Sequence, residues 1–124
     1  MAGKSVNKVI LVGYVAADPV SLASHPNSRV SFEVAVHCEY RSDGEKIEVT
    51  DYHRVVAWGR LGEICAKYLS KGQGVYVEGV LLNRGGGHFS TEIRANEVNM
   101  LTWRKRGGVE NFSVVDVEVN KFGF

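Results

Sequence analysis

Apolar residues occupy every second position from Val30 to Cys38, and this pattern limits the possible folds more than any other feature of the chain. The apolar set is Val30, Phe32, Val34, Val36 and Cys38, and the residues between them are Ser31, Glu33, Ala35, His37 and Glu39. A period of two places successive side chains on opposite faces of an extended backbone. The stretch therefore predicts a half-buried strand. Val is spread over nearly the whole chain, with 14 Gly against 2 Pro, which favours further strands joined by turns.

Four more segments are expected to form strands, and one is expected to form a helix. The expected strands are Asn7–Val15, Val30–Cys38, Ile47–Trp58, Val75–Leu82 and His88–Met100. Apolar residues at helical spacing predict one amphipathic helix after the third strand, with Gly72 as its C-terminal cap; they are Leu61, Ile64, Cys65, Tyr68 and Leu69. This order predicts an all-β fold with one short helix, the five-stranded Greek-key barrel of the OB-fold.

The length of 124 residues predicts one domain with a short appendage. Residues 1–106 are expected to form the barrel domain, and residues 107–124 a short C-terminal extension that begins at Gly107-Gly108. Within the extension, Val115, Val117 and Val119 alternate with polar residues. This alternation predicts an extra C-terminal strand.

Charge, hydropathy and cysteine usage argue against several classes of protein. The formal net charge of +1 excludes strong attraction to polyanions by net charge alone. No apolar run approaches the length of a membrane span, and Met1–Ser5 shows no secretory signal, so no membrane partner is expected. Cys38 and Cys65 are too few and too far apart for a disulfide framework, which indicates a reducing compartment.

No group of residues typical of catalysis is present, so an enzyme is not expected. The His residues are scattered, and no metal or cofactor site is predicted. Gly72-Gln73-Gly74 lacks the third glycine and the following helix of a dinucleotide-binding fingerprint. Cys65 with His53 is a conceivable nucleophile pair, but Cys65 falls on the apolar face of the expected helix, which favours core packing.

Aromatic and basic residues share one face of the third expected strand. Tyr52, Arg54 and Trp58 have the same parity there, and Tyr40-Arg41 ends the preceding strand. Aromatic rings interleaved with guanidinium groups suit the stacking of unpaired bases and the binding of their phosphates. A dimer interface, or an amphipathic strand with ordinary cross-strand pairs, remains the alternative interpretation. Arg104-Lys105-Arg106 is interpreted as a solvated cluster.

Four segments together resemble bacterial single-stranded DNA-binding proteins. They are Val6–Gly13 followed by Asp18-Pro19, Tyr52–Leu61, Tyr68–Gly72 and Val75–Gly79, in the family's order between residue 6 and about residue 101. The resemblance implies an OB-fold and a homotetramer built as a dimer of dimers. It also implies sequence-independent binding and protection of single-stranded DNA during replication, recombination and repair. It implies no catalysis, and a cytoplasmic, nucleoid-associated location, with an organellar or phage origin left open.

The resemblance also assigns residues by position. Tyr40, Tyr52 and Trp58 occupy the base-stacking positions, and the backbone-contacting positions hold Lys4, Lys8, Arg54, Arg60, Lys71 and Arg84. His53 and Asn7 are expected at the subunit interface.

The chain departs from the family pattern in three ways. Tyr replaces Trp at two stacking positions, which keeps a π-face of smaller area. The position of a frequent stacking aromatic falls near Gly86, where Phe89 is the substitute to consider. The acidic tip that recruits repair enzymes is absent, so this recruitment is not expected. Two alternatives stay open: an OB-fold accessory adaptor that binds mainly proteins, and an RNA-binding OB module, since base stacking does not distinguish the sugars.

Overall fold

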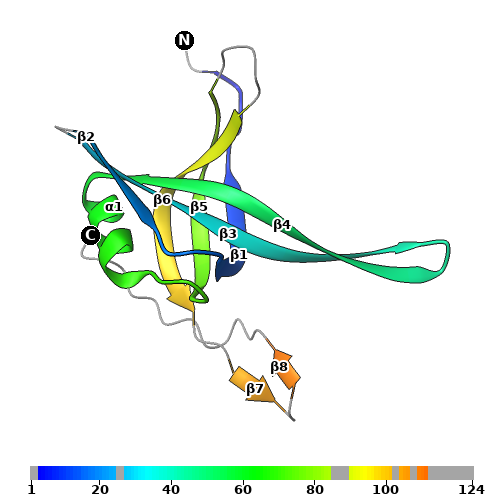
Figure 1. Ribbon diagram of the computed structural model, residues 1–124. Helices are drawn as coiled ribbons and strands as arrows, with labels where there is room; N and C mark the ends of the chain where they lie inside the picture. The colour runs from blue at the N-terminus through cyan, green and yellow to red at the C-terminus, as the bar shows by residue number, and fades with distance from the viewer. Residues whose placement is uncertain (1–2, 25–26, 85–89, 102–103, 107–108, 112–124) are drawn as a thin grey trace.

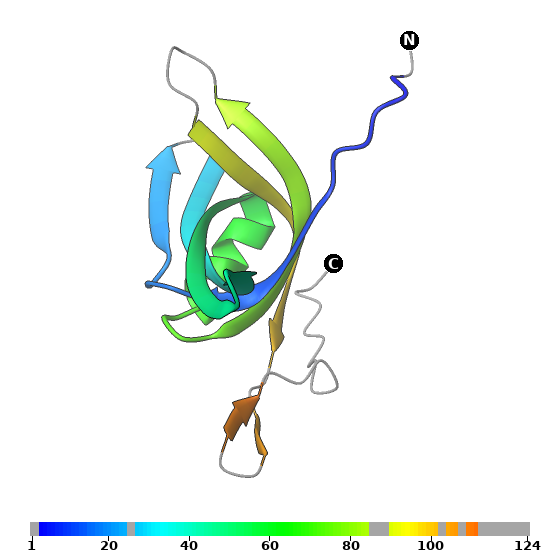
Figure 2. The same ribbon diagram turned by 90° about the vertical axis from the view of Figure 1, so that its right-hand side faces the viewer.

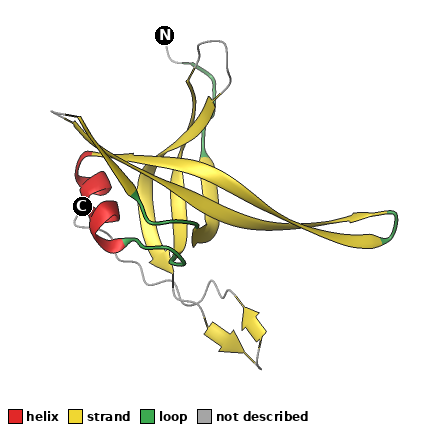
Figure 3. Cartoon of the chain, in the orientation of Figure 1, coloured by secondary structure: helices red, strands yellow, loops and turns green. Residues whose placement is uncertain are grey.

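The computed structural model describes residues 3–24, 27–84, 90–101, 104–106 and 109–111 (Figure 1). These residues form strands and one helix (Figure 3). The elements are β1 (Val9–Val15), β2 (Val20–Ser24), β3 (Asn27–Ser42), β4 (Glu45–Trp58), α1 (Gly59–Tyr68), β5 (Gly74–Arg84), β6 (Ser90–Leu101), β7 (Arg104–Arg106) and β8 (Val109–Asn111).

A closed barrel is formed by β1, β5, β6, β4 and β3 in that order around the sheet. Closure comes from the pairing of Tyr14 with Ala35 and of Val15 with Val34, which joins β1 to β3. All neighbouring strands are antiparallel except β4 and β6, which pair in parallel over a short stretch. In Figure 2 α1 is seen behind the ring of strands, and Figure 1 shows that it lies at one end of the barrel. The expected five-stranded barrel with one helix is confirmed.

Two glycines allow strands to cross closely where the barrel curves. A Cβ atom on Gly13 would lie 2.2 Å from the carbonyl oxygen of Ala35, and one on Gly79 would lie 2.1 Å from the carbonyl oxygen of Arg94. Gly79 follows an irregularity in the pairing of β5 with β6, as is usual where a strand bends. Any larger residue would push these backbones apart.

Valine side chains from several strands make up most of the centre of the core. Val15, Val34, Val55, Val75 and Val77 have no exposed surface. The helix adds Leu61 and Cys65 to the same cluster, together with Leu69 just beyond its end. β-branched side chains suit this interior because they are stiff and pack well on a pleated surface.

Strands β3 and β4 continue past the barrel as a long two-stranded arm (Figure 1). They pair without interruption from Arg29 with Trp58 to Ser42 with Glu45. Asp43 and Gly44 both have positive φ, 51° and 81°, as a two-residue hairpin turn requires. The expected burial of Cys38 is wrong, because Cys38 lies on this arm and is exposed. The alternation of residue types continues along the arm, where no core is present to bury the Cys38 side chain.

The end of the helix differs from the expectation. The helix ends at Tyr68, and Leu69 is its C-cap in an extended conformation (φ −83°, ψ 142°). Gly72 is not the cap: its φ of +93° belongs to the next turn, where its N–H donates to the Val15 carbonyl at 2.8 Å. Leu69 is 4% exposed, whereas Tyr68 is 51% exposed, so burial of Leu69 turns the chain into the core before a glycine is reached.

Strands outside the barrel account for the remaining differences. β2 was not expected, and it pairs with β3 at the edge of the sheet. β7 and β8 form a separate two-stranded sheet, so the extra C-terminal strand present in the structure is β8. The alternation from Val115 to Val119 lies outside the described residues. The expected division after residue 106 falls inside the β7–β8 pair and stays a prediction. No helix in the described ranges is long and apolar enough to cross a membrane.

Candidate nucleic-acid interface

Tyr52, Arg54 and Trp58 project from the outward face of β4. Tyr52 is 58% exposed and Trp58 is 36% exposed, and the Arg54 side chain is 53% exposed. Val55 and Ala57 between them are fully buried, so inward packing of the alternate residues holds the outward face in place. Two large rings are thereby presented to solvent on a rigid strand.

Arg29, which the sequence analysis did not identify, belongs to the same face. It is the Cα partner of Trp58 across the β3–β4 ladder, and its guanidinium carbon lies 5.5 Å from the centre of the Trp58 ring. This separation is within the range of a cation–π interaction. Only the register of the two strands brings Arg29 and Trp58 together.

Arg54 is held by two groups from neighbouring strands. Its Nε lies 3.5 Å from an oxygen of Glu92 on β6 and donates to the hydroxyl of Ser31 on β3 at 3.4 Å. The Glu92 side chain is 6% exposed, so an almost buried carboxylate lies beneath the exposed guanidinium. Glu92 could not be identified from the sequence, because the β4–β6 contact is not visible in the local pattern.

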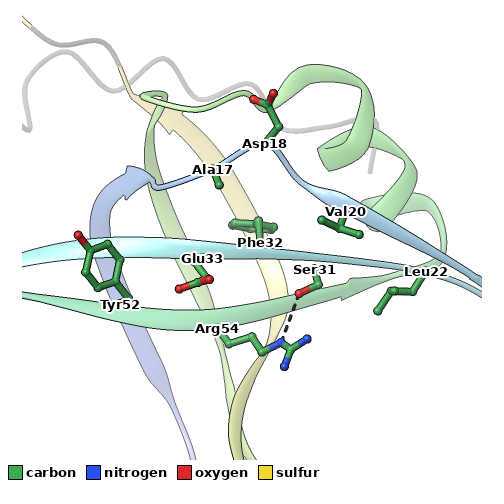
Figure 4. Close-up of a pocket in the computed structure, with 9 residues that line it drawn as sticks. All are labelled: Ala17, Asp18, Val20, Leu22, Ser31, Phe32, Glu33, Tyr52 and Arg54. Atoms are coloured by element: carbon green, nitrogen blue, oxygen red, sulfur yellow. Dashed lines mark hydrogen bonds between the residues drawn. The ribbon is translucent and has the colours of Figure 1, made fainter.

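A concavity of about 470 Å³ lies beside this face (Figure 4). Side chains from β4, β3 and β2, and from the segment between β1 and β2, line it. The lining residues are Ala17, Asp18, Val20, Leu22, Ser31, Phe32, Glu33, Tyr52 and Arg54. We call this concavity the Tyr52 groove. It combines an aromatic ring and an apolar wall with one cationic side chain, Arg54, and two carboxylates, Asp18 and Glu33.

Tyr40 does not share the face of Tyr52. Tyr40 is the Cα partner of Ile47, whereas Tyr52 is the partner of Ala35, and residues 40 and 35 have opposite parity on β3. Tyr40 is 54% exposed and lies on the arm, near a second concavity of about 410 Å³. Nearby, Lys46 forms ion pairs with Glu39 at 3.0 Å and with Glu48 at 3.5 Å. The hydrogen bond to Glu39 raises the pKa of Lys46.

The structure does not gather the other expected basic residues into one cluster. Lys4, Arg60 and Lys71 are exposed on the N-terminal segment, the first turn of α1 and the following loop. Lys8 forms an ion pair of 2.5 Å with Glu78, and the hydrogen bond in this pair raises the Lys8 pKa. Arg84 ends β5, and its side chain is outside the described part of the structure, as are Gly86 and Phe89.

The two residues expected at the subunit interface lie in different environments. The Asn7 side-chain amide donates to the carbonyl oxygen of Leu81 and accepts from its N–H, both at 2.9 Å. Asn7 therefore extends the β1–β5 pairing by one more link. His53 is half-buried on β4 and is the Cα partner of Val34, on the face opposite to Tyr52.

Cys65 is a core residue, as its position on the apolar helix face indicated. It has no exposed surface, and burial raises the pKa of its thiol to about 12, so it is protonated near neutral pH. Among the described residues, no group of three or more His, Cys, Asp or Glu could hold a metal ion.

Comparisons with known proteins find a matching family and similar proteins over most of the chain. The model of the single-strand binding protein family matches residues 6–101. Single-stranded DNA-binding protein 1 of Chlorobaculum tepidum is 37% identical over 114 residues, which cover 85% of this chain and 70% of that protein. The single-stranded DNA-binding protein of Xanthomonas axonopodis pv. citri is 43% identical over 113 residues, which cover 84% of this chain and 62% of that protein.

A solved structure is similar in fold. The structure described as a Plasmodium falciparum SSB complex with ssDNA superposes with a TM-score of 0.71 at 30% identity. The match covers 81% of this chain and 96% of that one.

Proposed function

The chain belongs to the single-strand binding protein family, and from this premise we propose that it binds single-stranded DNA without regard to sequence and protects it during replication, recombination and repair. The family assignment favours this function over the adaptor and RNA-binding alternatives. We assign no catalytic step to the chain. Its place of action in this proposal is the nucleoid, in the cytoplasm.

The exposed face of Tyr52, Arg54 and Trp58 is the observation that carries the proposal. Solvent-exposed Tyr and Trp side chains on a strand, with a guanidinium between them, have no role in the core of this chain. Base stacking on such rings is tolerant of sequence because every base has a π-face. In this proposal the two rings stack bases, Arg54 contacts the backbone, and Arg29 supports the Trp58 ring.

The remaining expected contacts belong to the same proposal. Tyr40 would stack a base outside the Tyr52 groove, on the arm. The bound DNA would have to pass to the other face of the β3–β4 pair to reach it. Lys4, Lys8, Arg60, Lys71 and Arg84 would contact phosphates. To contact a phosphate, Lys8 would have to break its ion pair with Glu78 or bind the phosphate and Glu78 together. We therefore expect Lys8 to contribute least to DNA affinity among these residues.

We further propose that the chain assembles as a homotetramer, a dimer of dimers. Ile10, Val12 and Tyr14 form an exposed apolar row on β1 and are 55%, 37% and 36% exposed. A row of this kind on a strand is suited to burial against a second copy. His53 and Asn7 are the residues we assign to the contacts between subunits.

A mass measurement with and without long poly-dT tests binding and assembly together. The proposal expects four chains in the absence of DNA and a stable complex in its presence, with quenching of Trp fluorescence on addition of poly-dT. Absence of a complex at low salt would contradict the DNA-binding proposal. A monomer at micromolar concentration would contradict the tetramer and leave the DNA-binding proposal standing.

A further inference from the structure

The charged groups that line the Tyr52 groove differ in whether they already have partners. Asp18 accepts the backbone N–H of Lys71 at 2.8 Å. Arg54 is engaged with Glu92 and Ser31. Glu33 is exposed, and its carboxylate has no hydrogen-bond or ion-pair partner among the described residues.

Glu33 occupies the middle of the proposed binding face. It is the Cα partner of Arg54, and the next pair on the same face of the ladder is Ala35 with Tyr52. Figure 4 shows its carboxylate between the Tyr52 ring and the Arg54 side chain, on the same side of the strands. Arg54 nevertheless turns to Glu92 on β6, which leaves the Glu33 oxygens open to a ligand.

A lone carboxylate at this position selects which part of a nucleotide enters the groove. It repels phosphate, since like charges in contact are unfavourable. It can accept hydrogen bonds from the exocyclic amino group of a base, as Asp and Glu accept from N4 of cytosine. The half-buried or exposed apolar side chains of Val20 and Leu22 on the opposite wall suit the flat face and edge of a base. These features suit a base better than a phosphate.

We propose that Glu33 is a specificity-determining residue, which accepts a hydrogen bond from the exocyclic amino group of the base stacked on Tyr52. This proposal rests on the proposed single-stranded DNA binding. It gives a nominally sequence-independent surface a preference at one position: where the carboxylate meets the C4 substituent, cytosine offers its amino group and is favoured over uracil or thymine, which carry the O4 carbonyl oxygen at that place.

Affinities for oligo-dC and oligo-dU of equal length test the proposal at a fixed salt concentration. These oligomers differ only on the base edge that meets Glu33, and neither carries the thymine methyl group. In Glu33→Ala oligo-dU should bind more tightly, because repulsion of the backbone is lost, whereas oligo-dC also loses its hydrogen bond to the carboxylate and should gain less. The ratio of Kd for dU to Kd for dC should fall by about two- to tenfold relative to the parent, the value of one hydrogen bond. Glu33→Gln should lower the ratio as well, since its NH2 group can donate to the uracil carbonyl.

Glu63→Ala is the matched control, because Glu63 is an exposed carboxylate on α1 outside the groove lining. It changes the net charge by the same amount and should leave the ratio as in the parent. An equal ratio in the parent, Glu33→Ala and Glu33→Gln would overturn the role of Glu33 and leave the proposed function intact. A parent protein that bound neither oligomer would overturn both proposals.

Discussion

At the scale of single residues, the two exposed rings on β4 carry the first prediction. Tyr52→Ala and Trp58→Ala should each weaken single-stranded DNA binding by about 1–3 kcal/mol, the value of one base stacked on an aromatic ring. The fold should survive, since neither ring is buried. Titration of oligo-dT measures the loss, and thermal unfolding reports the fold. Tyr68→Ala, an exposed aromatic on α1 outside the proposed face, should bind as the parent does, and equal affinity of all four proteins would rule out the stacking assignment.

Arg54 is predicted to affect binding and stability through separate contacts. Arg54→Ala should lower the free energy of unfolding by about 1–3 kcal/mol, because it removes the cation beside the nearly buried carboxylate of Glu92. Combining Arg54→Ala with Glu92→Gln should restore stability without restoring DNA affinity, since the charge that needed compensation is gone. Denaturant unfolding and DNA titration of both variants measure the two effects. Recovery of affinity in the double variant would show that Arg54 does not contact DNA.

At the scale of elements, the crossing of β1 over β3 is the most constrained point of the barrel. Gly13→Ala should destabilise the fold by about 1–3 kcal/mol, a typical cost of forcing extra atoms into a packed site. The reason is that the new Cβ would lie 2.2 Å from a backbone oxygen of Ala35, which cannot rotate away as a side chain would. Denaturant unfolding measures the loss. Gly44→Ala is the comparison. An added Cβ at Gly44 would meet no atom within 4 Å, but φ is positive there, so this variant measures the cost of backbone strain without a collision.

Cys65 on α1 should make the free energy of unfolding depend on pH in the alkaline range. Burial raises the folded-state pKa of this thiol from 9.0 to about 12, so the unfolded chain loses the proton first. Stability from this group is complete below about pH 9 and declines as pH rises toward 12, by up to about 1.4 kcal/mol per pH unit. Unfolding curves of the parent and Cys65→Ala between pH 8 and pH 11 give the free energy of unfolding at each pH. The effect of Cys65 is the difference between the two proteins in the slope of this free energy against pH. Parallel pH dependences would show that Cys65 ionises in the folded state as readily as in the unfolded one.

At the scale of the whole molecule, DNA binding should depend strongly on salt although the net charge is only +1. Each phosphate contact with a single strand contributes about −0.7 to the slope of log K against log salt concentration. Arg60→Ala and Lys71→Ala should therefore each make the slope less steep by about 0.7. Lys67→Ala is the control, because its ammonium lies over the Tyr68 ring, 5.2 Å from its centre, outside the proposed contacts. A flat salt titration of the parent would contradict a phosphate-tracking surface.

Much of the fold was predictable from local patterns. The alternation that begins at Val30 predicted β3 because the side-chain period of a strand is visible between near neighbours in the chain. Its outer limit was not predictable, since Cys38 continues the pattern on an arm with no core beneath it. β2 was missed for a related reason: a short edge strand is stabilised by its pairing with β3, and its own residues carry no clear period.

The candidate site was also predictable only in part. The sequence alone determined the barrel strands, the single helix and the common face of Tyr52, Arg54 and Trp58, because these depend on spacing along one segment. Only the tertiary structure decided that Arg29 supports Trp58, that Glu92 lies beneath Arg54, that Glu33 faces the groove without a partner among the described residues, and that Tyr40 lies on the other face of the arm. These relations depend on strand register and on contacts between residues far apart in the chain, and a register shift of one residue would reverse every one that crosses the β3–β4 ladder.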